Sequence, residues 1–462
     1  QMNSMINRLL AAASLVAIMA ASSAYADENP MLDSKFWKDK DLSAIEAIVG
    51  EGHSVTQITS NGFTPLIQAI RAQAPIEVLE YLIAQGADVN RPGHDERPAI
   101  FWAARNGTLE SVNFLIEQGA DVQALDDSGR NALGYAAFGQ EDPAVFARLI
   151  ELGLSPAEKD SAGRDAALSA AYFNPNLETI ELLAKAGGDL SSKTTKGEDA
   201  FMLAAYRNKS VDVVKAMKAY SENPQAKNED GNDALLLAAY RNGSLEVIDY
   251  LLAEGFAPEA TDNEGRNALA IAATRNSLEV VEKFASIGLD VNATDNAGGT
   301  ALLNAVVRNS PEVVDFLIAQ GANVNATDKA GNSALLLAAG RDRKGVDSIV
   351  ASLLAAGASA KVVSAKGETV LTKAARSNQP AALLQAYIDN GADVNAVDGD
   401  ETSALMYAAL KSDTTDNIKL LLAAGADATL KDGFDTTAAE IATANELLNG
   451  TDAVALIEAA VK

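Results

Sequence analysis

The sequence contains no cysteine and only two histidines, His53 and His94, among its 462 residues. Without cysteine it has no disulfide framework, no thiolate nucleophile and no cysteine-based metal site. Two histidines leave little from which to build a metal centre or a catalytic relay. The phosphate-binding loop G-x-x-x-x-G-K-[ST], the nucleophile elbow G-x-S-x-G and the zinc motif H-E-x-x-H are also missing. We therefore expect that the protein is not an enzyme and has no catalytic residue, no cofactor and no metal.

Aromatic side chains and positive charge are both scarce. Aromatic residues make up 5% of the chain, so Leu, Ala, Val and Ile must build the core. That composition favours thin layers with small side chains at the contacts. The chain has 37 Lys and Arg against 63 Asp and Glu, a formal net charge of −26. Because binding to phosphates or to anionic lipids needs clustered positive charge, we expect neither nucleic-acid binding nor a polybasic membrane anchor.

Long hydrophobic runs are missing except for one short run near the first residue. The segment MINRLLAAASLVAIMAASSAYA has a positive charge at Arg8, an apolar run over 9–20 and an A-x-A site at 24–26. This order is typical of a secretory signal peptide, which we place at residues 1–26. The alternative is a membrane anchor, for which the run is too short. We expect an exported, periplasmic protein that does not insert into the membrane after signal cleavage.

A repeat of 33–36 residues fills most of the chain, and such a period indicates a repeat architecture. Eleven units can be aligned on one turn residue each, which is Gly62, Glu96, Gly129, Gly163, Gly197, Gly231, Gly265, Gly298, Gly331, Gly367 and Glu401. We assign the repeats to residues 61–430.

Each unit has the same internal pattern. In almost every unit, a side chain that caps helix N-termini, such as Thr64 or Asp233, stands two positions after the turn residue. A short Ala/Leu-rich helix follows, for example over 234–241, and a second helix, for example over 245–253, ends at a glycine such as Gly255. The first helix is too short to persist alone in water, so neighbouring units must stabilise one another.

These units resemble the ankyrin repeat. The likeness is carried by segments such as GFTPLIQAI…IEVLEYLIAQGADVN at 62–90 and by repeated GADVN endings. It identifies the chain as similar to ankyrin-repeat proteins of an exported bacterial type. The family's Thr-Pro-Leu-His is altered, because only Thr64-Pro65-Leu66 keeps its first three residues and no unit has the histidine. We expect an all-α fold: an ankyrin-type α-solenoid of stacked helix-turn-helix repeats with short β-turn or hairpin connections.

The two ends of the array differ from its middle. Residues 27–60 are predicted to form an N-terminal leader and a capping half-repeat, in which 27–34 are loose and Phe36 and Trp37 cover the first full unit. Residues 431–462 are predicted to form a C-terminal capping helix pair. The units near 217–226 and 340–354 are irregular, because one lacks the closing glycine and the other has extra residues.

One repeated pattern is not required by stacking. Arginine recurs at one position of five successive units, often with tyrosine before it. In proteins that the chain resembles, these positions face the concave side, where partners commonly bind. The candidate partner-binding residues are therefore Tyr206, Arg207, Tyr240, Arg241, Arg275, Arg308 and Arg341.

Two interpretations of this arginine stripe stay open. Arginine and tyrosine are enriched in binding hot spots, but the stripe is also explained as a relic of repeat duplication. Asparagine follows arginine at Asn208, Asn242, Asn276 and Asn309, and asparagine tolerates a left-handed turn, so the pair also reads as a helix-ending signal.

We expect a non-enzymatic protein-binding scaffold in the periplasm that holds an acidic protein surface in its concave groove. The sequence does not identify the partner. Two alternatives are binding of an anionic small molecule or glycan in the cell envelope, and protection of an exported enzyme, for example under oxidative stress.

Overall fold

The computed structural model describes residues 29–38, 40–341 and 344–461. The predicted signal peptide at 1–26 lies outside these ranges. Within them, no helix combines the length and the apolar character needed to cross a bilayer. The chain divides into two compact units: unit 1 ends at Glu229 and unit 2 begins at Asp230.

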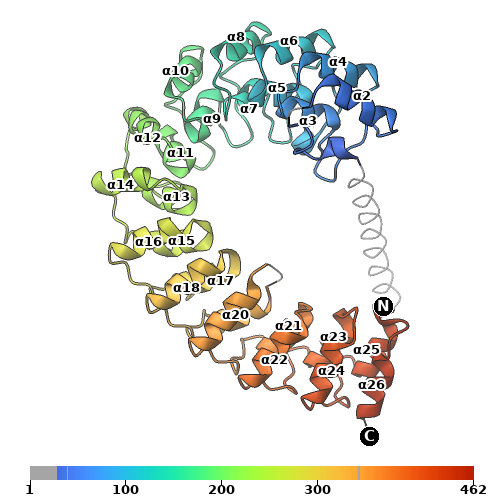
Figure 1. Cartoon of the computed structure of the whole chain (residues 1–462). Coiled ribbons are helices and arrows are strands. Elements are labelled where there is room, and N and C mark those ends of the chain that lie inside the picture. Colours follow the sequence, from blue (N-terminus) through green and yellow to red (C-terminus); the bar gives the residue numbers. More distant parts are fainter. Residues whose placement is uncertain (1–28, 39, 342–343, 462) are drawn as a thin grey trace. The chain divides into compact units, whose positions relative to one another are not determined.

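Unit 1 is built from paired α-helices with short 3₁₀ turns (Figure 1). Its elements are η1 (Pro30–Leu32), α2 (Leu42–Gly50), α3 (Pro65–Arg71), α4 (Ile76–Ala84), η2 (His94–Glu96), α5 (Ala99–Asn106), α6 (Leu109–Glu117), α7 (Ala132–Ala136), α8 (Pro143–Glu151), α9 (Ala166–Phe173), α10 (Leu177–Lys185), α11 (Ala200–Arg207), α12 (Val211–Met217) and η3 (Lys218–Tyr220).

Unit 2 repeats the same helix pair (Figure 1). Its elements are α13 (Ala234–Arg241), α14 (Leu245–Ala253), α15 (Ala268–Arg275), α16 (Leu278–Ser286), α17 (Ala301–Arg308), α18 (Pro311–Ala319), α19 (Ala334–Ala339), α20 (Val346–Ala355), α21 (Val370–Arg376), α22 (Ala381–Asp389), α23 (Ala404–Lys411), α24 (Asp416–Ala423), α25 (Ala438–Ala444), η4 (Glu446–Leu448) and α26 (Ala453–Ala460).

The predicted caps start the first helix of each repeat. The side chain of Asp233 accepts a hydrogen bond from the backbone N–H of Leu236 at 2.9 Å, and Asp199 does the same for Met202 at 3.0 Å. Such bonds satisfy N–H groups that a helix leaves free in its first turn. The capping prediction is confirmed at these positions, whereas α5 begins after Pro98, which makes no side-chain cap bond.

The turn residues are confirmed as well, including the two that are not glycine. Gly265 has φ +79°, in the left-handed region that favours glycine. Glu96 and Glu401, which take the same place in their units, have φ +60° and +59°. In unit 2 an isolated antiparallel bridge, such as that between Thr327 and Ser333, closes a turn. The connections are therefore the short β-turns that the repeat pattern predicts.

The first helices of successive repeats pack on one another and are buried almost throughout. In α13 every residue over 234–239 is buried, whereas α14 buries only the stripe of Val247, Ile248 and Leu251. Because α15 packs directly on α13 and on α17, the small Ala and Leu side chains of these helices fill the core. In α13 the two residues that are not buried, Tyr240 and Arg241, lie in its last turn.

The N-terminal segment is more ordered than the loose leader that we expected. Met31 and Leu32, in η1, are buried. The indole Nε1 of Trp37 donates a hydrogen bond to the Met31 carbonyl at 2.9 Å. Gln68 Nε2 of α3 donates to the Leu32 carbonyl at 3.0 Å, so this segment covers the first repeat.

Candidate functional site

Four of the predicted partner-binding residues line one pocket of unit 2. The pocket has a volume of about 570 Å³ and is lined by Tyr240, Arg241, Arg275, Asn276 and Arg308. Tyr240 and Arg241 end α13, Arg275 ends α15 and Arg308 ends α17, so three successive repeats each contribute one guanidinium group. We call this the arginine pocket.

The arginine pocket has a local charge opposite to that of the whole chain. None of its lining residues is acidic. Arg241 and Arg275 are exposed, and neither forms an ion pair or hydrogen bond within the described part of the chain. Guanidinium groups in this state are available for paired, charge-assisted hydrogen bonds to carboxylates. The second helices carry the opposite charge, since Glu246 and Asp249 are exposed on α14.

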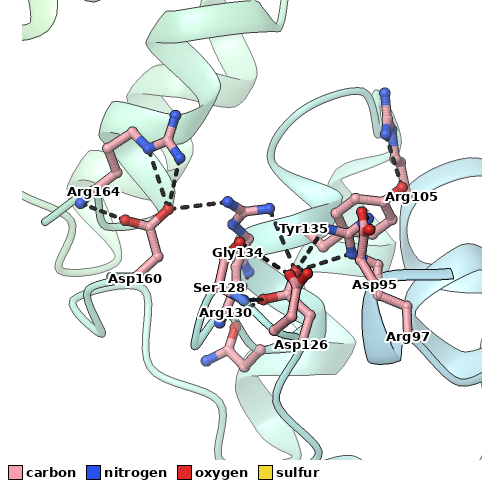
Figure 2. Close-up of polar contacts among 12 residues, drawn as sticks. Asp95, Arg97, Arg105, Asp126, Ser128, Arg130, Gly134, Tyr135, Asp160 and Arg164 are labelled. Carbon is pink, nitrogen blue, oxygen red and sulfur yellow. Dashed lines mark hydrogen bonds and ion pairs between the residues drawn. The ribbon is translucent and has the colours of Figure 1, made fainter. Parts of the chain in front are cut away.

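Unit 1 contains a chain of buried ion pairs (Figure 2). Arg97 binds Asp126 through Nε and Nη2, each at 2.9 Å. Arg130 then joins Asp126, at 3.5 Å, to Asp160, at 3.1 Å, and Arg164 also binds Asp160 at 3.0 Å. The Asp126 and Asp160 side chains are almost inaccessible to solvent, so this ion-pair ladder ties successive repeats together in the interior.

Aromatic rings run beside the ion-pair ladder. Neighbouring rings have centroids 5.4 to 6.4 Å apart, and the series is Phe63, Trp102, Tyr135, Phe138, Tyr172 and Tyr206. Arginines lie over these rings, with Cζ of Arg97 4.3 Å from the Tyr135 centroid and Cζ of Arg130 4.7 Å from that of Phe138. The predicted residues Tyr206 and Arg207 belong to this arrangement; Arg207 Cζ is 5.0 Å from the Phe173 centroid.

The repeats match a known family model. The model described as ankyrin repeats in three copies matches overlapping segments, namely residues 35–126, 78–161, 100–194, 167–262, 201–295, 235–328, 279–350 and 335–432. This chain is an ankyrin-repeat protein. No curated protein matches it. The resemblance to ankyrin repeats and the all-α solenoid fold expected from the sequence are both confirmed.

One member of the arginine stripe has a different position in this ankyrin-repeat protein. Arg341 is 7% exposed, and its Nη1 and Nη2 each donate a hydrogen bond of 2.7 Å, to the carbonyls of Val306 and Asn309. Its helix α19 ends early, at Ala339, with Gly340 as the C-cap. Arg341 therefore lies beyond the helix and holds the preceding repeat, unlike the exposed Arg241 and Arg275.

The asparagines after the arginines hold successive repeats together. The Asn276 Nδ2 donates hydrogen bonds to the carbonyls of Ala239, at 2.8 Å, and Asn242, at 3.1 Å, one repeat earlier. Amide side chains with equivalent bonds to the preceding repeat include Gln140, Asn174 and Asn208 in unit 1 and Asn276, Asn309, Gln379 and Asn445 in unit 2. We call this series the amide ladder.

The left-handed turn that we expected at these asparagines is not present. Asn208, Asn242, Asn276 and Asn309 have φ between −73° and −97° and an extended backbone. The extended C-cap points the side chain at the carbonyls of the preceding first helix. Asparagine is therefore explained by a long-range hydrogen bond rather than by turn geometry.

The sequence pattern missed two arginines that lie near the ring series. Arg71, the last residue of α3, and Arg105, the second-last residue of α5, each stand one position earlier in their repeats than Arg241 does in its own. Counting at a fixed position therefore passed over them. The visible signal is the recurrence of arginine just after the Ala-rich run, in QAIR and WAAR. Neither Arg71 nor Arg105 forms an ion pair within the described ranges.

The pKa values of Asp160 in unit 1 and Tyr407 in unit 2 are shifted in the fold. Burial alone would raise the pKa of the Asp160 carboxyl, but the backbone N–H of Arg164 and the guanidinium groups of Arg164 and Arg130 lower it overall. In unit 2, burial and a hydrogen bond of 2.6 Å to Asp398 raise the pKa of Tyr407 to about 12. Among the residues described, no cluster of three or more His, Asp or Glu has the geometry of a metal site.

Proposed function

We propose that this protein binds an acidic protein partner in the periplasm through the arginine pocket of unit 2. Ankyrin repeats generally mediate protein–protein interaction, and the family is typically a non-enzymatic scaffold. The observation that carries the proposal is the convergence of Arg241, Arg275 and Arg308 on one pocket without an acidic lining residue. Partner carboxylates are the groups that such a pocket recognises.

The arginine pocket is suited to binding without a conformational change. Its side chains stand on packed helices whose positions are fixed by the buried Ala and Leu residues of 234–239 and their equivalents. A preformed surface loses little entropy on binding. Tyr240 supplies contact area beside the charges, and tyrosine is among the residues enriched in hot spots.

The charges of the pocket can coexist without a ligand. Packed helices lie about 8–10 Å apart. Two like charges about 10 Å apart in water repel by only roughly 0.4 kcal/mol. The repulsion is therefore too weak to require a bound anion. Repeat duplication alone is enough to explain the arginine stripe. What supports binding is that Arg241 and Arg275 stay exposed, whereas Arg341 is used within the fold.

The periplasmic part of the proposal rests on the predicted signal peptide at residues 1–26. Its test is to express the full chain and follow both cleavage and location by fractionation. Recovery of the cleaved chain in the periplasmic fraction supports export, and an uncleaved chain in the cytoplasm would contradict it.

Site-specific photo-crosslinking in intact cells tests the partner. A photoreactive amino acid replaces Tyr240 at the pocket, and a matched control replaces Glu246 on the exposed face of α14. We expect one protein adduct from position 240, absent from position 246 and lost when Arg241 and Arg275 are changed to glutamate. Identical adducts from both positions would contradict the proposal. Saturable binding of a small anion or glycan, with no protein adduct, would favour the alternative ligand class.

A further inference from the structure

We propose that unit 1 has a second, separate binding site: a pocket that receives the carboxylate of a ligand beside Trp102. The pocket has a volume of about 310 Å³ and is lined by Ser34, Gln68, Arg71, Ala72, Trp102, Arg105 and Asn106. These side chains come from α3 and its C-cap Ala72, from α5 and from the segment after η1. The site does not depend on the arginine pocket of unit 2.

Two buried hydrogen-bond donors of this pocket have no acceptor. Trp102 is only 6% exposed, and its Nε1 has no hydrogen-bond partner in the described structure. The same is true of Arg105 Nε. A buried indole N–H usually has a partner, and a buried polar group without one costs free energy. A carboxylate oxygen in the pocket would supply the acceptor that the Trp102 Nε1 lacks.

The charge of the pocket points to an anion. Arg71 and Arg105 carry two positive charges, and no acidic residue lines the cavity. Neither arginine has an ion-pair partner among the residues described. Elsewhere in unit 1 the chain neutralises its buried guanidinium groups with Asp126 and Asp160. In the pocket at Trp102, by contrast, no carboxylate of the described chain pairs with Arg71 or Arg105.

The ion pairs of unit 1 favour a carboxylate as the anion. At two positions a guanidinium lies over an aromatic ring and binds a carboxylate: Arg97 over Tyr135 with Asp126, and Arg130 over Phe138 with Asp160. Arg71 repeats the first half of this arrangement, with Cζ 4.5 Å from the Phe63 centroid and 5.2 Å from that of Trp102. A ligand carboxylate would bind the Arg71 guanidinium as Asp126 binds that of Arg97.

The two arginines are held in place before a ligand arrives. Arg71 Nη1 donates to Gln68 Oε1 at 2.9 Å, and Gln68 Nε2 is anchored on the Leu32 carbonyl at 3.0 Å. Arg105 Nη1 donates to the Tyr135 hydroxyl at 2.9 Å. Each guanidinium therefore has further N–H groups available to a ligand. Because the side chains are already positioned, binding costs little side-chain entropy.

The size of the pocket limits the ligand. A volume of about 310 Å³ lies at the lower end of small-molecule sites, which span about 300–1,000 Å³. It accommodates a small carboxylic acid, or the side chain or C-terminus of a peptide that ends in a carboxylate. Both sources share the same chemistry, and the test below separates them.

Titration followed by the indole resonances in a proton–nitrogen correlation spectrum tests the site. The chain has two tryptophans. Trp37 Nε1 already donates to Met31 and serves as the internal reference, and Trp102→Phe assigns the second peak. Acetate replaces chloride at constant ionic strength, followed by N-acetylglutamate and an acidic peptide. We expect a saturable downfield shift of the Trp102 resonance alone.

Matched variants locate the effect. Arg105→Gln and the more exposed Arg71→Gln should each weaken acetate binding about tenfold, the factor expected for one charge-assisted hydrogen bond. Arg241→Gln in unit 2 should leave it unchanged. A stronger response to the peptide than to acetate identifies a protein source, and the reverse identifies a small acid. No saturable shift, an equal shift with sulfate, or full binding by both unit 1 variants would overturn the proposal.

Discussion

Arg275 and Asn276 are consecutive in the chain, yet their side chains have opposite surroundings. Arg275 is exposed in the arginine pocket, whereas Asn276 is 7% exposed and donates a 2.8 Å hydrogen bond to the Ala239 carbonyl of the preceding repeat. The end of a first helix thus serves two purposes in adjacent positions. One residue is available to a ligand, and the next holds the stack together.

Stability should therefore depend on Asn276 and not on Arg275. In Asn276→Ala, the carbonyls of Ala239 and Asn242 lose their donor in a buried position, which should lower the free energy of unfolding by about 2–3 kcal/mol. Arg275→Ala removes an exposed side chain and should change it by less than about 0.5 kcal/mol. Urea unfolding of both variants measures the difference. Equal losses would contradict the division of roles.

Acid should weaken unit 1 through Asp160. Its folded-state pKa is lowered, so its contribution to stability is present above the pKa of the unfolded state and is lost as pH falls through the folded value. We expect the urea midpoint of the wild-type protein to fall with acidification in that range. In Asp160→Asn this part of the pH dependence should vanish, and an unchanged acid profile in the variant would show that Asp160 makes no such contribution.

Alkali should weaken unit 2 through Tyr407. The pKa of Tyr407 is raised to about 12 in the fold, above the value of about 10 expected in the unfolded chain. The folded state then retains a proton that the unfolded state loses, so stability declines from pH about 10 to about 12. Comparing urea midpoints of the wild type and Tyr407→Phe across that window isolates the effect. The variant, which cannot ionise there, should show the flatter profile; parallel profiles would rule the effect out.

The spacing of the arginine pocket predicts the periodicity of its ligand. Successive first helices lie about 8–10 Å apart, and a polyproline II segment advances about 9 Å in each turn of three residues. Glutamate at every third position of such a segment therefore places its carboxylates on one face, at the spacing of Arg241, Arg275 and Arg308.

Peptides of equal charge and length test this periodicity. A peptide that repeats Glu-Pro-Pro should bind about tenfold more tightly than a peptide with the same number of glutamates at every second position. Fluorescence anisotropy of labelled peptides measures both affinities. The preference should shrink in Arg275→Gln, which removes the middle charge. Equal affinities would mean that binding depends on the number of glutamates and not on their spacing, which would contradict the prediction.

Local chemistry made much of the fold predictable. A cap such as Asp233 or a turn residue such as Gly265 acts within three or four residues, so its effect can be read from the neighbouring sequence. The amide ladder could not be derived in this way. The role of Asn276 depends on carbonyls more than thirty residues earlier, and therefore on how the repeats stack.

The candidate site was predictable only in part for the same reason. Tyr240, Arg241, Arg275 and Arg308 follow the repeat register and line one pocket. Arg341 follows the repeat register in sequence, but its helix α19 ends early, at Ala339, so Arg341 lies outside the helix. Arg71 and Arg105 break the register, and only the structure shows Trp102 beside them without a hydrogen-bond partner.

The most direct test of the proposed function is the affinity of a labelled Glu-Pro-Pro peptide for two charge-reversed forms of the chain. One carries Arg241→Glu and Arg275→Glu in the pocket. The other carries Lys361→Glu and Lys366→Glu, which change the net charge equally at exposed positions that do not line the pocket. We predict that the first weakens binding by about a hundredfold, the loss expected for two charge-assisted bonds, and that the second has little effect. Equal weakening by both, or no weakening by the first, would contradict the account.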